Sequence, residues 1–252
     1  HVAVTATQYT ADVNDTDAFR MGETCAVKTW ELTGASLSAN IYTIADLNDA
    51  FTKAEEISFQ DIAGGSKAQK RLVECVETLY LNDALSAPLD LGSLSAHGIV
   101  YESYTLAYTT SLVADIFTNN ITNDALFAEG GYVQRPLTHA DGTSENAWWV
   151  PTGRHTYASD ATSHFYLPSG VRNPFGNITA ITRDNYYLLI TSVTDALGNV
   201  VTALNDYRTL APSMLIDPNG NRDAVATDEL GMVVKTAVMG KVGSNEGDTL
   251  DD

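Results

Sequence analysis

Two short stretches, Asp195-Ala-Leu-Gly198 and Asp217-Pro-Asn-Gly220, decide the fold of this chain. Each carries the residues that a tight turn requires: the aspartate side chain accepts backbone N–H groups, and the glycine permits the positive φ that ends the turn. The two turns begin twenty-two residues apart, and the chain between them is rich in aliphatic residues and threonine. This combination predicts antiparallel strands joined by tight turns, that is, β-hairpins.

These turns belong to a longer repeat. Asn or Asp recurs every eleven residues over residues 173–228, and glycine follows three residues later at four of these positions. The structural turn residues that we predict are Asn173, Gly176, Asp195, Gly198, Asp217, Gly220, Asp228 and Gly231. Eleven residues suit one strand and one turn, so each hairpin takes twenty-two. Repeated hairpins must stack on their neighbours to bury a face, which predicts an extended, curving antiparallel sheet.

The strands expected between these turns are short apolar runs. They cover residues 178–182, 186–194, 200–204, 214–216 and 232–239. The units that begin at Asp184 and Asp206 lack the glycine and carry Tyr186, Tyr187 and Tyr207 instead. The turns therefore alternate in composition along the repeat.

The first part of the chain is also predicted to be β-rich. Alternating apolar residues predict strands over 2–9, 26–32, 70–81 and 101–109. Helical spacing predicts a helix over 44–55 that Thr43 caps, and two helical pieces within 111–128, interrupted at Asn119-Asn120 and ended by Glu129-Gly-Gly131. The expected fold class is mainly β, with a few short helices in residues 43–128. We expect a β-rich region over residues 1–172, and hairpin repeats over residues 173–252 that continue the same sheet.

Adjacent tryptophans, Trp148 and Trp149, follow a polar stretch over residues 138–145 that we expect to be exposed. Neighbouring residues of a strand point to opposite faces, so both faces are expected to meet other structure at this point. The two indoles and Tyr157 also suggest a platform for a sugar ring. A carbohydrate- or cell-surface-binding module is therefore the alternative function, although packing is the interpretation that we favour.

Composition narrows the class of protein. The chain has 252 residues, 44% of them hydrophobic, and a formal net charge of −18. This charge argues against nucleic acid and against an anionic membrane surface as partners. It fits high solubility, or a surface complementary to a basic partner. The two cysteines, Cys25 and Cys75, are too few for a disulfide scaffold, and we expect two buried free thiols.

Several motifs, in their order along the chain, resemble a known family. The repeat sequences look like the YD (Rhs-type) repeats of the B component of insecticidal Tc toxin complexes. The motifs that carry the resemblance are Asn173-Pro-Phe-Gly-Asn177, Asp195-Ala-Leu-Gly-Asn199, Asn205-Asp-Tyr-Arg208, Asp217-Pro-Asn-Gly-Asn-Arg222 and Asp228-Glu-Leu-Gly231, with Tyr101-Glu-Ser-Tyr104, Trp148-Trp-Val-Pro-Thr-Gly-Arg154 and His164-Phe-Tyr-Leu-Pro168 upstream. The motifs cover most of residues 25–252.

The resemblance implies a structural role. In that family the B and C components form a hollow β-sheet shell that holds a cytotoxic polypeptide, which leaves through a pore formed by the A component. The resemblance therefore implies a wall segment with the C component, the A component and the enclosed polypeptide as partners, in a secreted complex, without membrane contact of its own. The start at His1, without a leader pattern, suggests an excised or processed piece.

Catalytic and metal-binding interpretations find little support in the residues. The five histidines form no paired motif, although His155 and His164 lie near Asp160 in the sequence. The stretch from Asp217 to Asp223 resembles a calcium loop, but the equivalent turn at Asn173 offers far fewer oxygens. We therefore predict no enzyme activity, no catalytic residue, no cofactor and no metal site.

Overall fold

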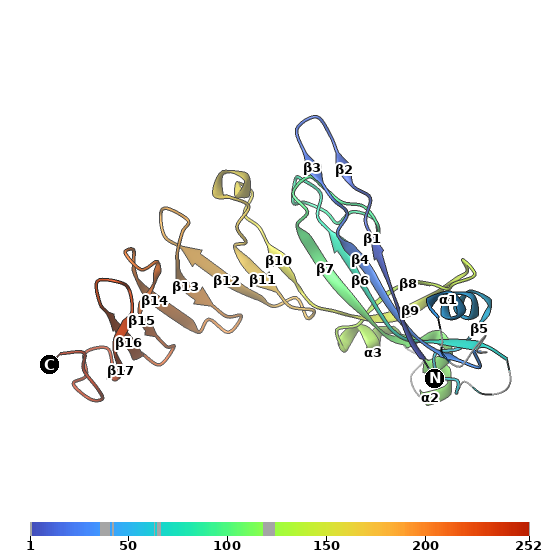
Figure 1. The fold of residues 1–252 in the computed structure, drawn as a ribbon. Coiled ribbons are helices and arrows are strands. Elements are labelled where there is room, and N and C mark those ends of the chain that lie inside the picture. Colours follow the sequence, from blue (N-terminus) through green and yellow to red (C-terminus); the bar gives the residue numbers. More distant parts are fainter. Residues whose placement is uncertain are drawn as a thin grey trace. The chain divides into compact units, whose positions relative to one another are not determined.

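The computed structural model describes residues 2–35, 41, 43–62, 64, 67–117 and 124–251. The chain divides into two compact units, His1–Gly153 and Arg154–Asp252 (Figure 1). Antiparallel strands dominate both units, which confirms the predicted fold class. The units hold separate sheets, and their boundary differs from the division at residue 172 that the sequence suggests. The reason is pairing, because the strand Gly170–Arg172 pairs both with Arg154–Thr156 before it and with the first repeat strand, Ile178–Arg183, after it.

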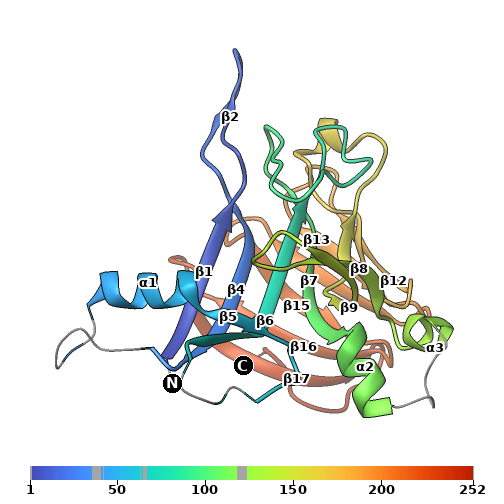
Figure 2. The same cartoon turned by 90° about the vertical axis from the view of Figure 1, so that its right-hand side faces the viewer.

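The first unit is built on a seven-stranded sheet with the order β1-β4-β6-β7-β9-β8, and a short β5 pairs with β6 in parallel. The bounds are β1 Val2–Tyr9, β4 Thr24–Thr33, β5 Glu55–Ile57, β6 Gln69–Tyr80, β7 Val100–Thr109, β8 Val133–Thr138 and β9 Ser144–Pro151. A separate hairpin, β2 Val13–Asn14 and β3 Phe19–Arg20, extends past the ends of β1 and β4 (Figures 1 and 2).

Three short helices belong to this unit: α1 Ile44–Lys53, α2 Thr110–Phe117 and α3 Asp124–Glu129. Helix α1 begins where the sequence predicts, because Thr43 and Asp46 form a capping box. It ends at Lys53, before the predicted residue 55, because residues 55–57 join the sheet beside β6. The break predicted at Asn119-Asn120 lies outside the described residues. Helices α1 and α2 lie at the opposite end of the sheet from the β2–β3 hairpin (Figure 2).

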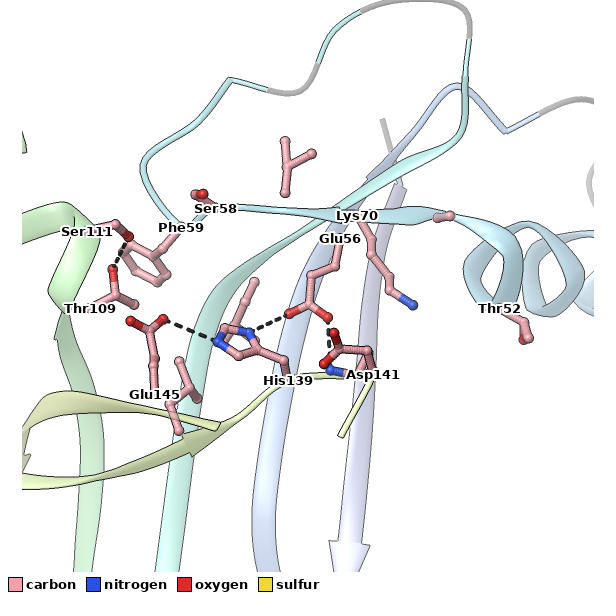
Figure 3. Close-up of a pocket in the computed structure, with 15 residues that line it drawn as sticks. Thr52, Glu56, Ser58, Phe59, Lys70, Thr109, Ser111, His139, Asp141 and Glu145 are labelled. Atoms are coloured by element: carbon pink, nitrogen blue, oxygen red, sulfur yellow. Dashed lines mark hydrogen bonds and ion pairs between the residues drawn. The ribbon is translucent and has the colours of Figure 1, made fainter. Parts of the chain in front are cut away.

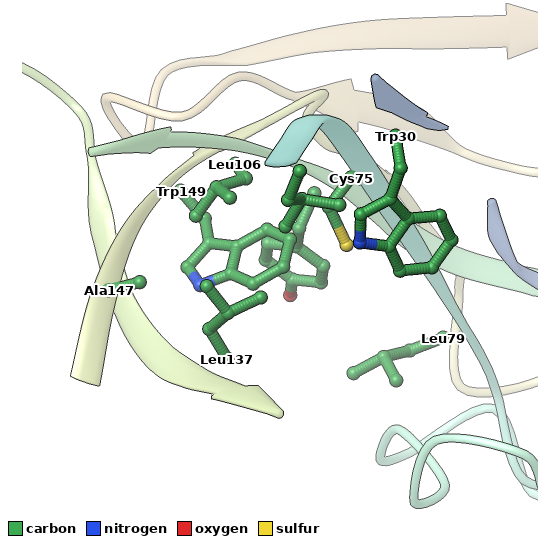
Figure 4. Packing of buried hydrophobic residues seen from close by; sticks show 9 residues of the cluster. Trp30, Cys75, Leu79, Leu106, Leu137, Ala147 and Trp149 are labelled. Carbon is green, nitrogen blue, oxygen red and sulfur yellow. The ribbon is translucent and has the colours of Figure 1, made fainter. Parts of the chain in front are cut away.

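The core of the first unit lies on one face of the sheet. Strand β6 has consecutive exposed residues, Val73 and Glu74, where its ladder with β4 shifts register. The irregularity places Leu72 and Cys75 on the same buried face, whereas strict alternation would separate them. The cluster that results contains Trp30, Leu72, Cys75, Leu79, Tyr104, Leu106, Leu137, Ala147 and Trp149 (Figure 4).

The tryptophan pair packs against both faces of β9, as predicted. The Trp149 side chain is fully buried in the cluster, and its Nε1 donates to the carbonyl of Arg135 at 3.1 Å. The Trp148 side chain lies on the other face and stacks on Phe127 of α3, with ring centroids 4.6 Å apart. One dipeptide therefore fixes both the main core and the position of α3.

Charged groups are also buried in this unit. Arg135 pairs with Glu77, which is only 4% exposed, at 2.9 Å and lies over the ring of Tyr104. The Tyr104 hydroxyl donates to buried Glu102 at 2.8 Å. Burial, reinforced by Glu102, raises the pKa of Tyr104 well above its usual range. Such a network stabilises the folded state only while each partner is present, because removing one partner leaves a buried charge unpaired.

Both cysteines are free and buried, as predicted. Cys25 lies on β4 and Cys75 on β6. Burial raises the pKa of the Cys75 thiol to about 12, and it also raises the pKa of Cys25.

The second unit is an eight-stranded antiparallel meander in which each strand pairs with the next one along the chain (Figure 1). The bounds are β10 Arg154–Thr156, β11 Gly170–Arg172, β12 Ile178–Arg183, β13 Ile190–Thr194, β14 Val200–Asp206, β15 Ala211–Ile216, β16 Asn221–Thr227 and β17 Val233–Lys241. A 3-10 helix, η1 Ala161–His164, lies between β10 and β11. The sheet is open, with β10 and β17 at its edges.

Two features of this sheet differ from the sequence-based expectation. Strand β16 was not predicted, because Arg222 and Asp223 interrupt its apolar pattern, although Ala224 is 3% exposed. Residues 186–189, predicted as strand, form a turn instead, since Tyr187 takes a positive φ of 58°.

The buried cluster of the first unit makes a stability prediction. Replacing Trp149 with alanine should lower the free energy of unfolding of this unit by about 3–5 kcal/mol, because it leaves a cavity in the core. Urea denaturation followed by circular dichroism measures the change. Val150→Ala is the matched control, since Val150 is 44% exposed on the same strand. Equal losses for the two variants would contradict the assigned core.

Candidate functional site

The repeat turns lie on two opposite sides of the second sheet. We call the turns that begin at Asn173, Asp195 and Asp217 the first rim, because they join β11 to β12, β13 to β14 and β15 to β16. The turns that begin at Asp184, Asp206 and Asp228 form the second rim. This division explains the glycine spacing. Gly176, Gly198 and Gly220 are twenty-two residues apart because they lie in successive turns of the first rim. Gly231 follows Gly220 after only eleven residues because its turn belongs to the second rim.

Turns that contain the glycine share one geometry. In the turn that begins at Asp217, the N–H of Gly220 donates to the Asp217 carbonyl at 2.9 Å, and the Asp217 N–H donates to the carbonyl of Asn221. The same two bonds form in the turns that begin at residues 173, 195 and 228. The closing glycines have φ values of 87°, 85°, 87° and 84° for Gly176, Gly198, Gly220 and Gly231.

In each turn that contains the glycine, the side chain of the opening Asp or Asn accepts at least two backbone N–H groups. Asp217 Oδ1 accepts the N–H groups of Asn219 and Asn221, both at 2.8 Å, and its Oδ2 accepts the Asn221 side-chain amide. Asp195 makes the corresponding three bonds, and Asn173 Oδ1 accepts two backbone N–H groups. Oxygens that face N–H donors do not form a calcium cage. In the described part of the chain, no cluster of three metal-ligating side chains is present.

These bonds change the acidity of the turn aspartates. The Asn221 side-chain amide, followed by the backbone N–H groups, lowers the pKa of Asp217. Asn199 lowers the pKa of Asp195 in the same way. The turns therefore prefer the carboxylate form of these residues.

Turns of the second rim are tied to one another by side chains. The Tyr207 hydroxyl donates to Asp184 Oδ2 at 2.6 Å, which lowers the pKa of Asp184 and raises that of Tyr207. Arg208 donates to Thr227 Oγ1 at 2.6 Å and to the Asp228 carbonyl at 2.7 Å. Each tie joins turns that begin twenty-two residues apart, so the tyrosines and Arg208 of the repeat couple neighbouring hairpins.

This rim also continues into η1. The ring of Tyr187 stacks on His164, with centroids 3.8 Å apart and planes 16° from parallel. His164 Nδ1 lies 3.5 Å from Asp160, whereas His155 is exposed. His164 therefore packs from η1 against the turn that begins at Asp184.

A pocket in the first unit is a second candidate site, and the sequence did not reveal it. Its cavity of about 520 Å³ lies between β5, β6 and the β8–β9 hairpin (Figure 3). His139 lies between two carboxylates: its Nδ1 is 3.2 Å from Glu56 and its Nε2 is 3.2 Å from Glu145. Glu56 also accepts the N–H of Ala140 at 2.9 Å, which anchors the hairpin to β5.

The charged groups of this pocket hold the β8–β9 hairpin against β5. Both ring nitrogens of His139 face carboxylates, so neither is free to activate a nucleophile. Lys70, 6% exposed, donates to the Phe51 carbonyl at 3.2 Å and lies over the Phe51 ring. The predicted exposure of residues 138–145 holds for most of this stretch, but His139 and Glu145 are half-buried in the pocket.

The two tryptophans pack inside the first unit, which is the interpretation that the sequence favours over a sugar platform. Trp148 is 8% exposed and Trp149 is fully buried, so their faces cannot stack on a ligand. The local composition could not reveal this, because a platform and a packed core use the same aromatic residues. In the described residues, no helix has the length and hydropathy needed to cross a bilayer.

The second unit is an open antiparallel hairpin sheet, and more than nine tenths of the chain matches the fold of solved Tc toxin structures. The TcdB2–TccC3 crystal structure without its hypervariable C-terminal region matches 93% of this chain with a TM-score of 0.71 and 17% identity. The Tc holotoxin pore of Photorhabdus luminescens, with a mutated TccC3, matches 94% with a TM-score of 0.70 and 16% identity. The structure of TcdB2–TccC3–Cdc42 matches 93% with a TM-score of 0.68 and 16% identity.

These matches cover 10%, 11% and 11% of the solved chains, so this chain spans about a tenth of their length. No protein-family model and no curated protein matches the sequence. At this level of identity the likeness shows a common fold. It confirms, for the fold, the resemblance to Tc toxin components that the sequence motifs indicate.

The positive φ at Gly198 makes a turn prediction. Gly198→Ala should cost about 1–2 kcal/mol, because an alanine resists the left-handed conformation although its Cβ would meet open space. Gly198→Asn should cost less, since asparagine tolerates this conformation. Thermal unfolding of the two variants measures the difference. Equal losses of stability in the two variants would show that the positive φ does not explain why glycine occupies position 198.

The acidity of Asp217 makes a pH prediction. Because its folded pKa is lowered, the turn gains stability above the unfolded pKa, about 3.9, and loses that stability as the pH falls through the folded pKa. NMR of the Gly220 amide from pH 6 downward should report the loosening only in this acidic window. Asp217→Asn should abolish the dependence of this amide on the carboxyl titration. A shift of the amide at neutral pH on addition of calcium would contradict the turn assignment.

Proposed function

We propose that this chain is a non-catalytic wall segment of a hollow β-sheet shell, in a secreted Tc-type toxin complex that encloses a cytotoxic polypeptide. The observation that carries the proposal is the fold, which aligns over nearly its whole length with Tc toxin structures at TM-scores near 0.7. Because the alignment covers more than nine tenths of the chain, it includes the hairpin sheet and is not limited to one motif. The C and A components of such a complex would be its protein partners.

The architecture supports a role in enclosing rather than in reacting. The turn carboxylates of Asp195 and Asp217 each accept three bonds within their own turns, and His139 is held between two carboxylates. The hairpin sheet is a single layer whose strands carry half-exposed side chains on both faces. A layer of this kind separates two compartments, whereas an enzyme needs convergent reactive groups.

Imaging of the native protein that contains residues 1–252 tests the proposal. Electron microscopy under non-denaturing conditions should find hollow particles with both sheets in the wall. A polypeptide that purifies with the particles should resist protease until the particles are denatured. Trp149→Ala should release it at a lower urea concentration than Val150→Ala does, since the core of the wall is weakened. Particles without a lumen, or a bound polypeptide that protease degrades at once, would contradict the proposal.

A further inference from the structure

His139 makes two contacts that a neutral imidazole cannot both make favourably. Its Nδ1 lies 3.2 Å from Glu56 Oε1, and its Nε2 lies 3.2 Å from Glu145 Oε1 (Figure 3). A neutral imidazole has one N–H group and one lone pair, so one of its nitrogens would turn a lone pair toward a carboxylate oxygen. An imidazolium donates at both nitrogens. The geometry therefore requires one proton more than a neutral histidine and two carboxylates hold.

The second oxygen of each glutamate indicates where this proton lies. Glu56 Oε2 accepts the N–H of Ala140 at 2.9 Å. Glu145 Oε2 accepts the N–H of Thr110, the first residue of α2, at 3.3 Å. Each glutamate therefore already receives a backbone N–H donor, and such a bond is stronger when its acceptor is charged. The proton that both contacts require belongs on the imidazole ring.

The other charged groups that line the pocket also attract a proton to this ring. Asp141, in the β8–β9 turn, adds a third carboxylate, and Lys70 of β6 adds an ammonium. With three carboxylates and one ammonium, the described lining is negative before His139 takes up the proton, and a negative surrounding attracts a positive ring. The His139 side chain is 29% exposed, so solvent still stabilises a charge there.

The two contacts connect three parts of the first unit. Glu56 belongs to β5, His139 follows β8, and Glu145 belongs to β9 and bonds to the start of α2. Histidine is the side chain whose charge ordinarily changes between about pH 5 and 8. Once the ring has lost its additional proton, it can donate to only one of the two glutamates.

We propose that His139, Glu56 and Glu145 form a proton-dependent clasp, which ties the β8–β9 hairpin to β5 and to α2 while the ring is an imidazolium and releases one of its two contacts when the ring is neutral. Because the closed form binds the additional proton, closure and proton binding stabilise each other. The clasp is complete at mildly acidic pH and loosens as the pH rises through the titration of His139. It does not depend on the proposed shell, because all three residues belong to the first unit.

NMR of the protein, labelled with ¹⁵N in its histidine rings and backbone, tests the clasp. The ring nitrogen shifts of His139 between about pH 8 and 5 report whether the ring carries one proton or two. The Ala140 and Thr110 amides report the two arms, since they donate to Glu56 and Glu145. Their hydrogen exchange, corrected for the intrinsic effect of pH, should be about fivefold slower when the ring is protonated, and this change should follow the titration of His139.

Glu145→Gln separates a proton-dependent clasp from a fixed one. Its amide oxygen can accept the Thr110 N–H, and its NH₂ group can donate to Nε2 of a neutral His139, so both contacts form without the additional proton. Both amides should then exchange at one corrected rate across the pH range, as slowly as in the unaltered protein at acidic pH. His155→Gln is the matched control, because His155 is exposed on β10 and its loss should leave the pH response unchanged.

Three results would overturn the inference. One is a neutral His139 ring at a pH where the Ala140 and Thr110 amides are already fully protected. Another is a corrected exchange rate of these amides that stays constant through the titration of His139. The third is a pH response of Glu145→Gln equal to that of the unaltered protein. The first two are measured without any substitution, so they decide the outcome even if a variant does not fold.

Discussion

The oxygen atom that opens each hairpin turn is the constraint on which the second unit depends. By accepting two backbone N–H groups, it ends one strand and starts the next at a fixed residue. Because the turns begin every eleven residues, successive strands have similar lengths, and the pairs β13–β14 and β15–β16 keep an unbroken register, whereas the β14–β15 pair shifts between Leu204 and Asn205. Asn173 makes the same two bonds as Asp217 without a charge, so the acceptor geometry matters more than the carboxylate.

The two units use different means to hold their strands. The second unit repeats one local solution, and its stability is expected to add up from hairpin to hairpin. The first unit depends on contacts between residues that are distant in sequence, such as Trp149 in the core and Glu77 with Arg135. A substitution in the first unit therefore affects several strands at once, whereas a substitution in one turn affects two.

The same difference explains what the sequence can predict. The turns and most strands of the repeat follow from local residues, because the Asx side chain accepts N–H groups two and four residues ahead and the glycine three residues ahead bonds to the Asx carbonyl. The pocket does not, since Glu56 and His139 are separated by more than eighty residues and meet only through the order of the strands. Strand β16 was missed because Arg222 and Asp223 interrupt the apolar pattern beside a buried Ala224. The sequence leaves a tryptophan platform open as an alternative to packing, because the burial of the indoles depends on α3 and the core, which composition does not locate.

The ties of the second rim have a mechanical consequence. Tyr207 and Arg208 link successive turns on that side, whereas the turn oxygens of Asn173, Asp195 and Asp217 on the first rim bond within their own turns. On the first rim the turn that begins at Asp217 is tied to the segment after β17, because the Val242 N–H donates to the Gly220 carbonyl at 3.0 Å. A sheet with side-chain ties along one margin resists stretching more on that side than on the other. Its bending stiffness therefore depends on direction, and a change in curvature would separate the first-rim turns that begin at Asn173 and Asp195 more easily than the turns of the second rim.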